Sequence, residues 1–187
     1  MYIDRAGTID MKRVNFRGNR ACGSGGMFVR GGSTKLVMKG PFFFEGNTAS
    51  GCAGVGVNVG RSIGGQGGGL SLSGVSGAVI EGGSFSRNVG KVGGGGMGIS
   101  TYDERNAVVV TSTSIMGCLF DSNNARLFGG GLQNVNGKAG TSSLRLSQCT
   151  FRNNTANEGG GAYSENDPVR ITGKKRRRGE EGMNSLL

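Results

Sequence analysis

The sequence contains no histidine, and none of its four cysteines belongs to a Cys-x-x-Cys pair. Zinc fingers and zinc ribbons combine these two residue types at short spacings. The sequence therefore argues against a zinc site of either type.

Proline occurs only twice among 187 residues, although glycine occurs 40 times. Collagen combines glycine at every third position with abundant proline, so this composition excludes a collagen triple helix. Tryptophan is absent, and hydrophobic residues make up only 35% of the chain. This hydrophobic fraction is low for a large globular core, but it is sufficient for a thin core built from small stacked units.

Long apolar runs are also lacking. No run approaches the roughly 18–20 residues of a membrane helix, and the N-terminal residues show no apolar segment typical of a secretion signal. We therefore expect no transmembrane segment and no signal peptide in this chain. The repeat described next begins without a visible capping segment, which favours a fragment of a longer repeat protein or an incomplete gene model.

The sequence does contain a repeat centred on phenylalanine. Five segments place Asn three residues after Phe, a small residue two positions later, and a glycine-rich cluster after that. The five pairs are Phe16 and Asn19, Phe44 and Asn47, Phe85 and Asn88, Phe120 and Asn123, and Phe151 and Asn154. A constant motif at a variable interval is typical of one structural turn joined by loops of different lengths. We expect wide loops at 61–74 and 100–112, with an irregular extra strand as the alternative in the first.

Short apolar stretches with alternating character precede each repeat Phe and follow each glycine cluster, which predicts strands of three to five residues. Val108–Val110 lead towards Phe120, and Val55–Val57 follow the glycines of the second unit. No stretch shows the 3.6-residue periodicity of an amphipathic helix.

One such unit has too little apolar surface to fold alone, but stacking at about 4.8 Å on its neighbours buries both of its faces. The sequence therefore predicts an all-β, right-handed parallel β-helix, a solenoid of about five to six rungs, at residues 1–172. Residues 173–187 are predicted to form a basic flexible tail. In this fold the five repeat Phe rings form an internal stack. The five Asn residues line a turn, where Asn tolerates αL geometry and its amide bonds to backbone or to the next Asn. The glycine cluster supplies the positive φ of a sharp bend.

The pattern Phe-x-x-Asn-x-Ala followed by Gly-Gly-Ala or Gly-Gly-Leu resembles the repeat of the chlamydial polymorphic outer membrane proteins and of related right-handed β-helix proteins. The resemblance covers roughly residues 8–165 and is closest in the unit that begins at Phe151. The first two units depart from it, with Gly25-Gly26-Met27 and Ala53-Gly54-Val55. The resemblance implies a secreted or surface-displayed structural or adhesive module, located outside the cell or at its surface. Its partner would be an unidentified protein or glycan.

Many parallel β-helices of the pectin lyase-like type cleave polysaccharides, so a pectate-lyase-like carbohydrate-active enzyme is the alternative. Such sites need clustered carboxylates. Glu45 and Asp121 occupy the slot directly after the repeat Phe, and Arg17, Ser86 and Arg152 fill it in the other units. A repeat position that holds acidic, basic and hydroxyl side chains in different units is typical of the solvent-exposed outer surface. We therefore expect a protein that is not an enzyme, with no catalytic, cofactor-binding or metal-binding residues.

Two cysteines, Cys118 and Cys149, both lie two residues before a repeat Phe. They are expected to be neighbours at an inward position, as reduced packing residues or, alternatively, as a disulfide. Cys22 and Cys52 are a second pair that a disulfide could join.

The formal net charge is +10, and the longest basic run is Lys174, Lys175, Arg176, Arg177 and Arg178. We interpret this run as part of the tail, with weak polyanion binding as the alternative. No aromatic residue interleaves it, so base stacking has no support and we expect no specific nucleic acid partner.

Overall fold

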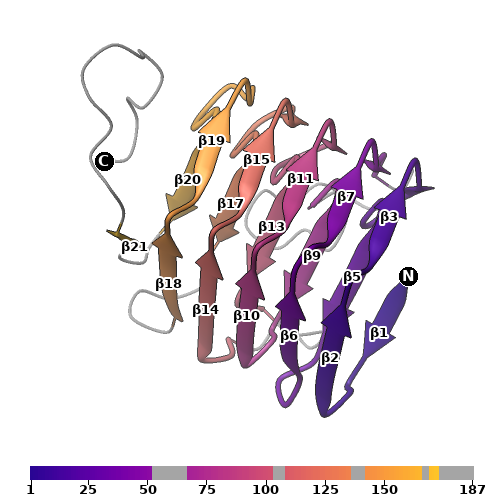
Figure 1. Cartoon of the computed structure of the whole chain (residues 1–187), viewed down its shortest axis with the longest axis vertical. Coiled ribbons are helices and arrows are strands. Elements are labelled where there is room, and N and C mark those ends of the chain that lie inside the picture. Colours follow the sequence, from indigo (N-terminus) through magenta and orange to yellow (C-terminus); the bar gives the residue numbers. More distant parts are fainter. Residues whose placement is uncertain (52–66, 103–107, 136–141, 166–168, 173–187) are drawn as a thin grey trace.

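The computed structural model describes residues 1–51, 67–102, 108–135, 142–165 and 169–172. Its strands form four parallel sheets, here called sheets A to D, and each strand pairs with the equivalent strand of the next rung (Figure 1). The chain therefore coils about one axis, with β1 at one end and β21 at the other. The predicted all-β parallel β-helix is confirmed, with about six rungs.

The four sheets contain the following strands. Sheet A contains β1 (Tyr2–Asp4), β5 (Met27–Arg30), β9 (Leu70–Ser73), β13 (Met97–Ser100), β17 (Leu132–Val135) and β20 (Ala162–Glu165). Sheet B contains β2 (Thr8–Lys12), β6 (Lys35–Lys39), β10 (Gly77–Glu81), β14 (Thr111–Met116), β18 (Ser142–Ser147) and β21 (Val169–Thr172). Sheet C contains β3 (Asn15–Arg17), β7 (Phe43–Glu45), β11 (Ser84–Ser86), β15 (Leu119–Asp121) and β19 (Thr150–Arg152). Sheet D contains β4 (Arg20–Ala21), β8 (Thr48–Ala49), β12 (Val89–Gly90) and β16 (Asn124–Ala125).

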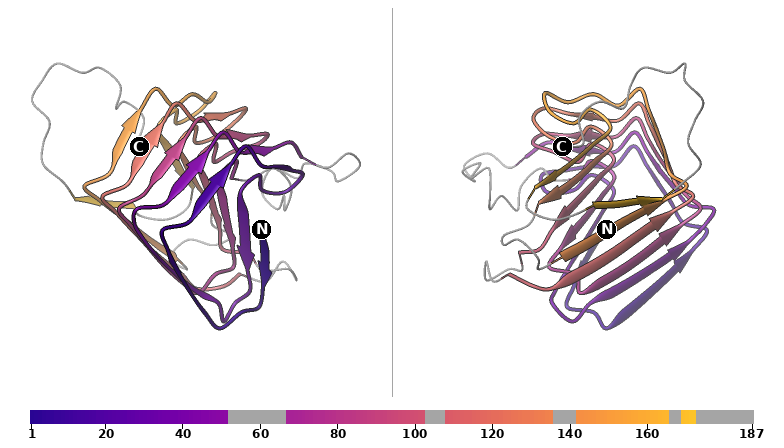
Figure 2. Two further views of the ribbon diagram at one scale, coloured as in Figure 1. Left: turned by 45° about the vertical axis from the view of Figure 1, so that its right-hand side comes forward. Right: turned by 90° about the vertical axis from the view of Figure 1, so that its left-hand side faces the viewer.

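Figure 2 shows the rungs stacked along one axis. The core is a set of side-chain columns that run along this axis. Residues alternate between inside and outside along each strand, so residues in register on successive rungs share one environment. In sheet B, for example, the column Met11, Met38, Ile80, Ile115 and Leu146 is in register. Its three central members are fully buried, whereas Met11 at the end of the stack is half-buried. Stacking therefore buries apolar area that a single rung would leave in water.

The second rung differs from the sequence prediction. Its glycine cluster is not Ala53-Gly54-Val55, because Gly68 and Gly69 occupy the positions that Gly25 and Gly26 occupy one rung earlier. The strand that follows is β9, a regular member of sheet A that lies within the expected wide loop. The insertion therefore comes before the glycines, and Val55–Val57 lie outside the described residues.

The strand before Phe120 also differs from the prediction. Val108 pairs with Tyr102 in an isolated antiparallel bridge, and Val110 is 73% exposed. The strand of the rung is instead β14, whose Thr111, Thr113 and Ile115 point inward. Apolar character predicted the wrong residues here because threonine also fills an inward position of this strand.

The turns between sheets C and D correct one part of the prediction for the repeat asparagines, their αL conformation. The αL conformation belongs to the residue just before each Asn: Gly18, Gly46, Arg87, Ser122 and Asn153 have φ between 54° and 63°. No repeat Asn has a positive φ. The Asn side chains are directed into the helix, where their amides bond to backbone and to one another.

Candidate functional site

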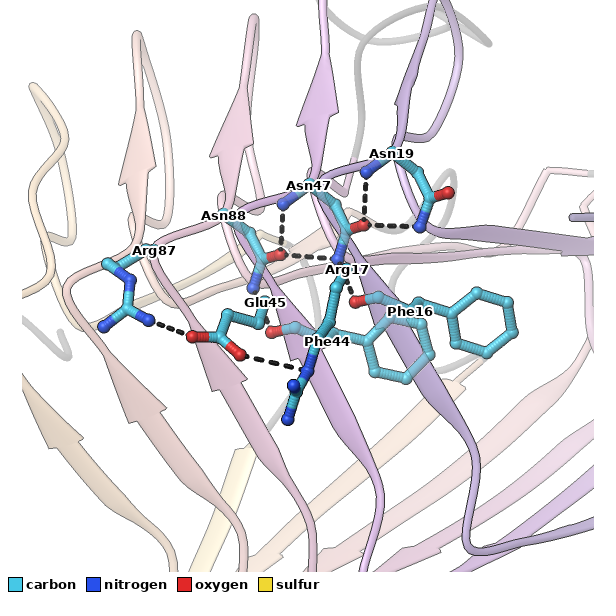
Figure 3. Close-up of polar contacts among 8 residues, drawn as sticks. All are labelled: Phe16, Arg17, Asn19, Phe44, Glu45, Asn47, Arg87 and Asn88. Atoms are coloured by element: carbon cyan, nitrogen blue, oxygen red, sulfur yellow. Dashed lines mark hydrogen bonds and ion pairs between the residues drawn. The ribbon is translucent and has the colours of Figure 1, made fainter.

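The repeat asparagines form a hydrogen-bonded ladder along the axis (Figure 3). The side-chain oxygen of Asn88 accepts from the backbone N–H and from Nδ2 of Asn47, at 3.0 Å each. Nδ2 of Asn88 donates to the carbonyl of Phe44 at 2.8 Å and to Oδ1 of Asn123 at 3.0 Å. Each central amide therefore makes four hydrogen bonds, which satisfies a polar group that would be costly to bury unpaired.

The ladder contains all five asparagines that the sequence predicted as structural. Asn47, Asn88 and Asn123 are fully buried. Asn19 at the first rung is exposed and donates to Asn47, while Asn154 at the last is half-buried and accepts from Asn123. The structure thus brings the predicted residues together, and their burial decreases towards both ends of the stack.

The repeat phenylalanines form the predicted internal stack beside this ladder. Successive rings of Phe16, Phe44, Phe85, Phe120 and Phe151 lie 4.8, 5.1, 4.8 and 4.6 Å apart between centroids. The planes of neighbouring rings differ by 10° or less. The three central rings are fully buried, so each contributes about 1.5–3 kcal/mol from burial of its apolar surface.

The glycine clusters create the space that the Phe stack and the Asn ladder need. A Cβ on Gly96 would lie 2.6 Å from the carbonyl oxygen of Gly131 and 3.1 Å from Cδ1 of Phe120. The φ of Gly96 is not positive, whereas that of Gly94, two residues earlier, is 60°. The predicted positive φ therefore applies to one glycine of the cluster, and close approach of backbone and ring explains the others.

On the outer face of the same rungs, charged residues form ion pairs between neighbouring coils. Glu45 lies between Arg17, at 3.2 Å, and Arg87 (Figure 3). Asp121 lies 2.9 Å from Arg152. The hydrogen bond from Arg152 holds the pKa of Asp121 below its usual value. Position in the repeat predicted that these acids face outward, but their partners become visible only when the register between rungs is known.

The outer face of sheet B changes character along the axis. In the early rungs, two of the three outward lysines lie beside acids: Lys12 is 3.7 Å from Asp10, and Lys39 is 3.6 Å from Glu81. In the later rungs, the outward residues of β14, β18 and β21 are hydroxyl-bearing or basic, except for Met116. These residues are Ser112, Ser114, Met116, Ser143, Arg145, Ser147, Arg170 and Thr172. This part of the face thus carries positive charge without a carboxylate.

The cysteines of adjacent rungs are free thiols. Cys118 is 2% exposed, and its Sγ lies 3.5 Å from the carbonyl oxygen of Met116. Cys149 is half-buried on the next rung and is likewise unpaired, as is the exposed Cys22. Burial raises the pKa of the Cys118 thiol to about 11. The favoured interpretation of reduced packing residues is confirmed for Cys118 and Cys149, and Cys52 lies outside the described residues.

Near the last rungs, Tyr163 lies close to two acidic residues. Burial, Glu165 and Glu158 together raise the pKa of its hydroxyl. The ring of Phe128 lies 4.8 Å from that of Tyr163. Within the described ranges, no three His, Cys, Asp or Glu side chains are grouped closely enough to hold a metal ion.

The predicted polyanion-binding run, Lys174–Arg178, lies outside the described residues. In the part of the chain that is described, no helix has the length and apolar character needed to cross a membrane.

Comparison with known proteins gives no match. No family model matches the sequence, and neither curated proteins nor solved structures match it significantly. The fold assignment therefore rests on the parallel strand pairing and on the internal repeat.

Proposed function

We propose that this chain is a structural and adhesive β-helix module, secreted or displayed at a cell surface, whose outer faces bind a glycan or protein partner. The observation that carries the proposal is the continuous Asn ladder beside the Phe stack. Because both link every rung from Phe16 to Phe151, the outward side chains stand in fixed rows along flat sheets. Because the backbone of these rows is already ordered, an extended partner can bind without the cost of ordering a loop.

The charged residues support the same proposal. Asp4, Asp10, Glu45, Glu81 and Asp121 each form an ion pair with a lysine or arginine. These five carboxylates therefore have partners within the helix itself. The resemblance of the repeat to that of the chlamydial polymorphic outer membrane proteins adds the expectation of extracellular display.

A polysaccharide-cleaving enzyme is the second candidate, and one observation favours it. Tyr163, Glu158 and Glu165 are close enough for both carboxylates to raise the pKa of the phenol. Glycosidases use a pair of carboxylates for acid–base chemistry, so Glu158 and Glu165 are the two residues to test for that role.

The two functions are separated by incubating the full chain with a panel of neutral and anionic polysaccharides and matrix proteins. We expect fold-dependent binding, lost after heat denaturation, with the length of each polysaccharide unchanged. Polysaccharide cleavage that disappears in the Glu158→Gln, Glu165→Gln double variant would overturn the proposal in favour of the enzyme. Absence of binding by the folded protein to every member of the panel would also overturn it.

A further inference from the structure

Arg145 and Arg170 occupy the same outward position on adjacent strands of sheet B. They are direct register partners in the pairing of β18 with β21, and both are exposed. Adjacent parallel strands lie about 4.8 Å apart, so two like charges are held side by side. Like charges directly opposite each other destabilise a sheet unless something compensates them.

Within the described ranges, neither of these arginines has an ion pair with a carboxylate, although ion pairing is common elsewhere on the surface. Arg17 and Arg87 share Glu45, and Arg152 bonds to Asp121. Two of the three lysines in the early rungs of sheet B, Lys12 and Lys39, also have acids beside them. The third, Lys35, has no ion pair with a described residue. Among the described residues of this face, Arg145 and Arg170 are thus two cations in direct register that have no acid beside them.

Hydroxyl groups surround this pair. Ser114 is the register partner of Arg145 on the preceding strand. Ser112 and Ser143 lie one outward position away and are 3.3 Å apart between their hydroxyl oxygens. Guanidinium groups bind tetrahedral oxyanions through two parallel N–H donors, and serine hydroxyls donate to the remaining oxygens. The combination suits a sulfate or phosphate group.

We propose that Arg145 and Arg170, with Ser112, Ser114 and Ser143, form a binding site for the sulfate groups of a sulfated polysaccharide. The proposal rests on the adhesive function proposed above and names the partner's chemistry. A linear glycan fits the flat, exposed sheet, and its sulfates would neutralise the adjacent guanidiniums. A nucleic acid fits less well because the outward residues of β14, β18 and β21 include no aromatic ring on which a base could stack.

The test measures binding of heparin, as the sulfated probe, to the full chain at several salt concentrations. In the double variant Arg145→Gln, Arg170→Gln we expect affinity to fall at least tenfold, with a smaller dependence on salt. The matched control, Lys12→Gln with Lys39→Gln, removes the same charge from the same sheet but from positions beside acids. This lysine variant is expected to change the affinity for heparin less than twofold. As a second control, heparin from which the N- and O-sulfates have been removed is expected to bind weakly to the wild type.

Several outcomes would overturn this site. Equal losses in both double variants would indicate general electrostatic attraction. An unchanged affinity in the arginine variant, together with loss when Lys174–Arg178 are replaced by serine in the full chain, would place binding in the tail. Tighter binding of single-stranded DNA than of heparin would favour a nucleic acid. Binding of neutral glycans alone would refute this site while leaving the adhesive function intact.

Misfolding of the double arginine variant could also lower its affinity for heparin. A thermal melt distinguishes misfolding from loss of the binding site. Both arginines are exposed, and their replacement removes a like-charge contact. The arginine variant is therefore expected to melt no lower than the wild type, so that a loss of heparin affinity in a stably folded variant supports the site.

Discussion

The side-chain oxygen of Asn123 accepts two hydrogen bonds from Asn88, one from the backbone N–H and one from Nδ2, each 3.0 Å long. These two residues are 35 positions apart, whereas the equivalent pair Asn19 and Asn47 is separated by 28 and the pair Asn47 and Asn88 by 41. The same contact thus forms at every step despite loops of different length. The ladder fixes the register of each rung on the next.

Replacing Asn88 with alanine should strongly destabilise the protein. The change leaves the amide of Asn47 and the carbonyl of Phe44 without their partner at a fully buried position. Each unpaired buried group costs about 1–3 kcal/mol, so we expect the free energy of unfolding to fall by about 3 kcal/mol or more. Urea unfolding followed by far-UV circular dichroism measures the difference.

The control for this variant is Asn19→Ala, which removes the same side chain at the exposed end of the ladder. This variant loses only one side-chain hydrogen bond, the bond to Asn47, and water replaces it. We therefore expect the free energy of unfolding to fall by about 1 kcal/mol or less. Similar losses in the two variants would show that burial does not determine the strength of the ladder.

Gly96→Ala should also destabilise the fold, because the added methyl group would overlap the backbone of Gly131 and press on the ring of Phe120. Overpacking of this kind typically costs about 1–3 kcal/mol. Gly77→Ala is the matched control: its Cβ would meet nothing closer than 3.9 Å, and its φ is not positive. The control is expected to be neutral or slightly stabilising in a thermal melt. Equal melting temperatures for the two variants would contradict the packing role of Gly96.

The buried Cys118 thiol should make stability depend on pH in the alkaline range. Its pKa rises from 9.0 in the unfolded chain to about 11 in the folded protein, so only the unfolded state ionises between these values. The buried neutral thiol therefore contributes fully to the free energy of unfolding below pH 9. As the pH rises to 11, the free energy of unfolding falls by up to about 3 kcal/mol. Val14 is the equivalent residue of the first rung, so valine fits this position. The Cys118→Val variant should therefore lose less stability between pH 9 and pH 11. Urea midpoints between pH 8 and pH 11 test this prediction, and identical pH slopes for the two proteins would refute it.

Asp121 should contribute to stability at neutral pH and lose that contribution in acid. Its pKa is lowered by the hydrogen bond from Arg152, so the contribution is present above the ordinary value of 3.8 and disappears as the pH falls through the lower folded value. Because the pair lies at the surface, Asp121→Asn should cost less than about 1 kcal/mol at pH 7, and the difference should vanish in strong acid. Asp10→Asn, at the more exposed pair with Lys12, serves as control. Acid titration of the urea midpoint gives both values, and a difference that persists in strong acid would contradict the role of the ion pair.

Much of the fold was predictable because stacked rungs impose the same environment on equivalent residues. Phe85 and Phe120 recur at fixed distances from Asn88 and Asn123 since each must contact its counterpart in the next rung. The same logic placed Cys118 and Cys149 on adjacent rungs. The predictions failed where this constraint was absent, as at Val108–Val110, or where an insertion separated a motif from its glycines, as before Gly68.

The sequence by itself determined the parallel β-helix, the inward Phe stack and the Asn ladder, because these contacts join like residues and therefore repeat along the chain. Only the tertiary structure decided which unlike residues meet on the outside. Arg145 could be counted back from Phe151, but no repeat Phe follows Arg170 in the chain, so the sequence offered no anchor for the register of the last strand. Backbone pairing between β18 and β21 supplies that register and brings the two arginines together.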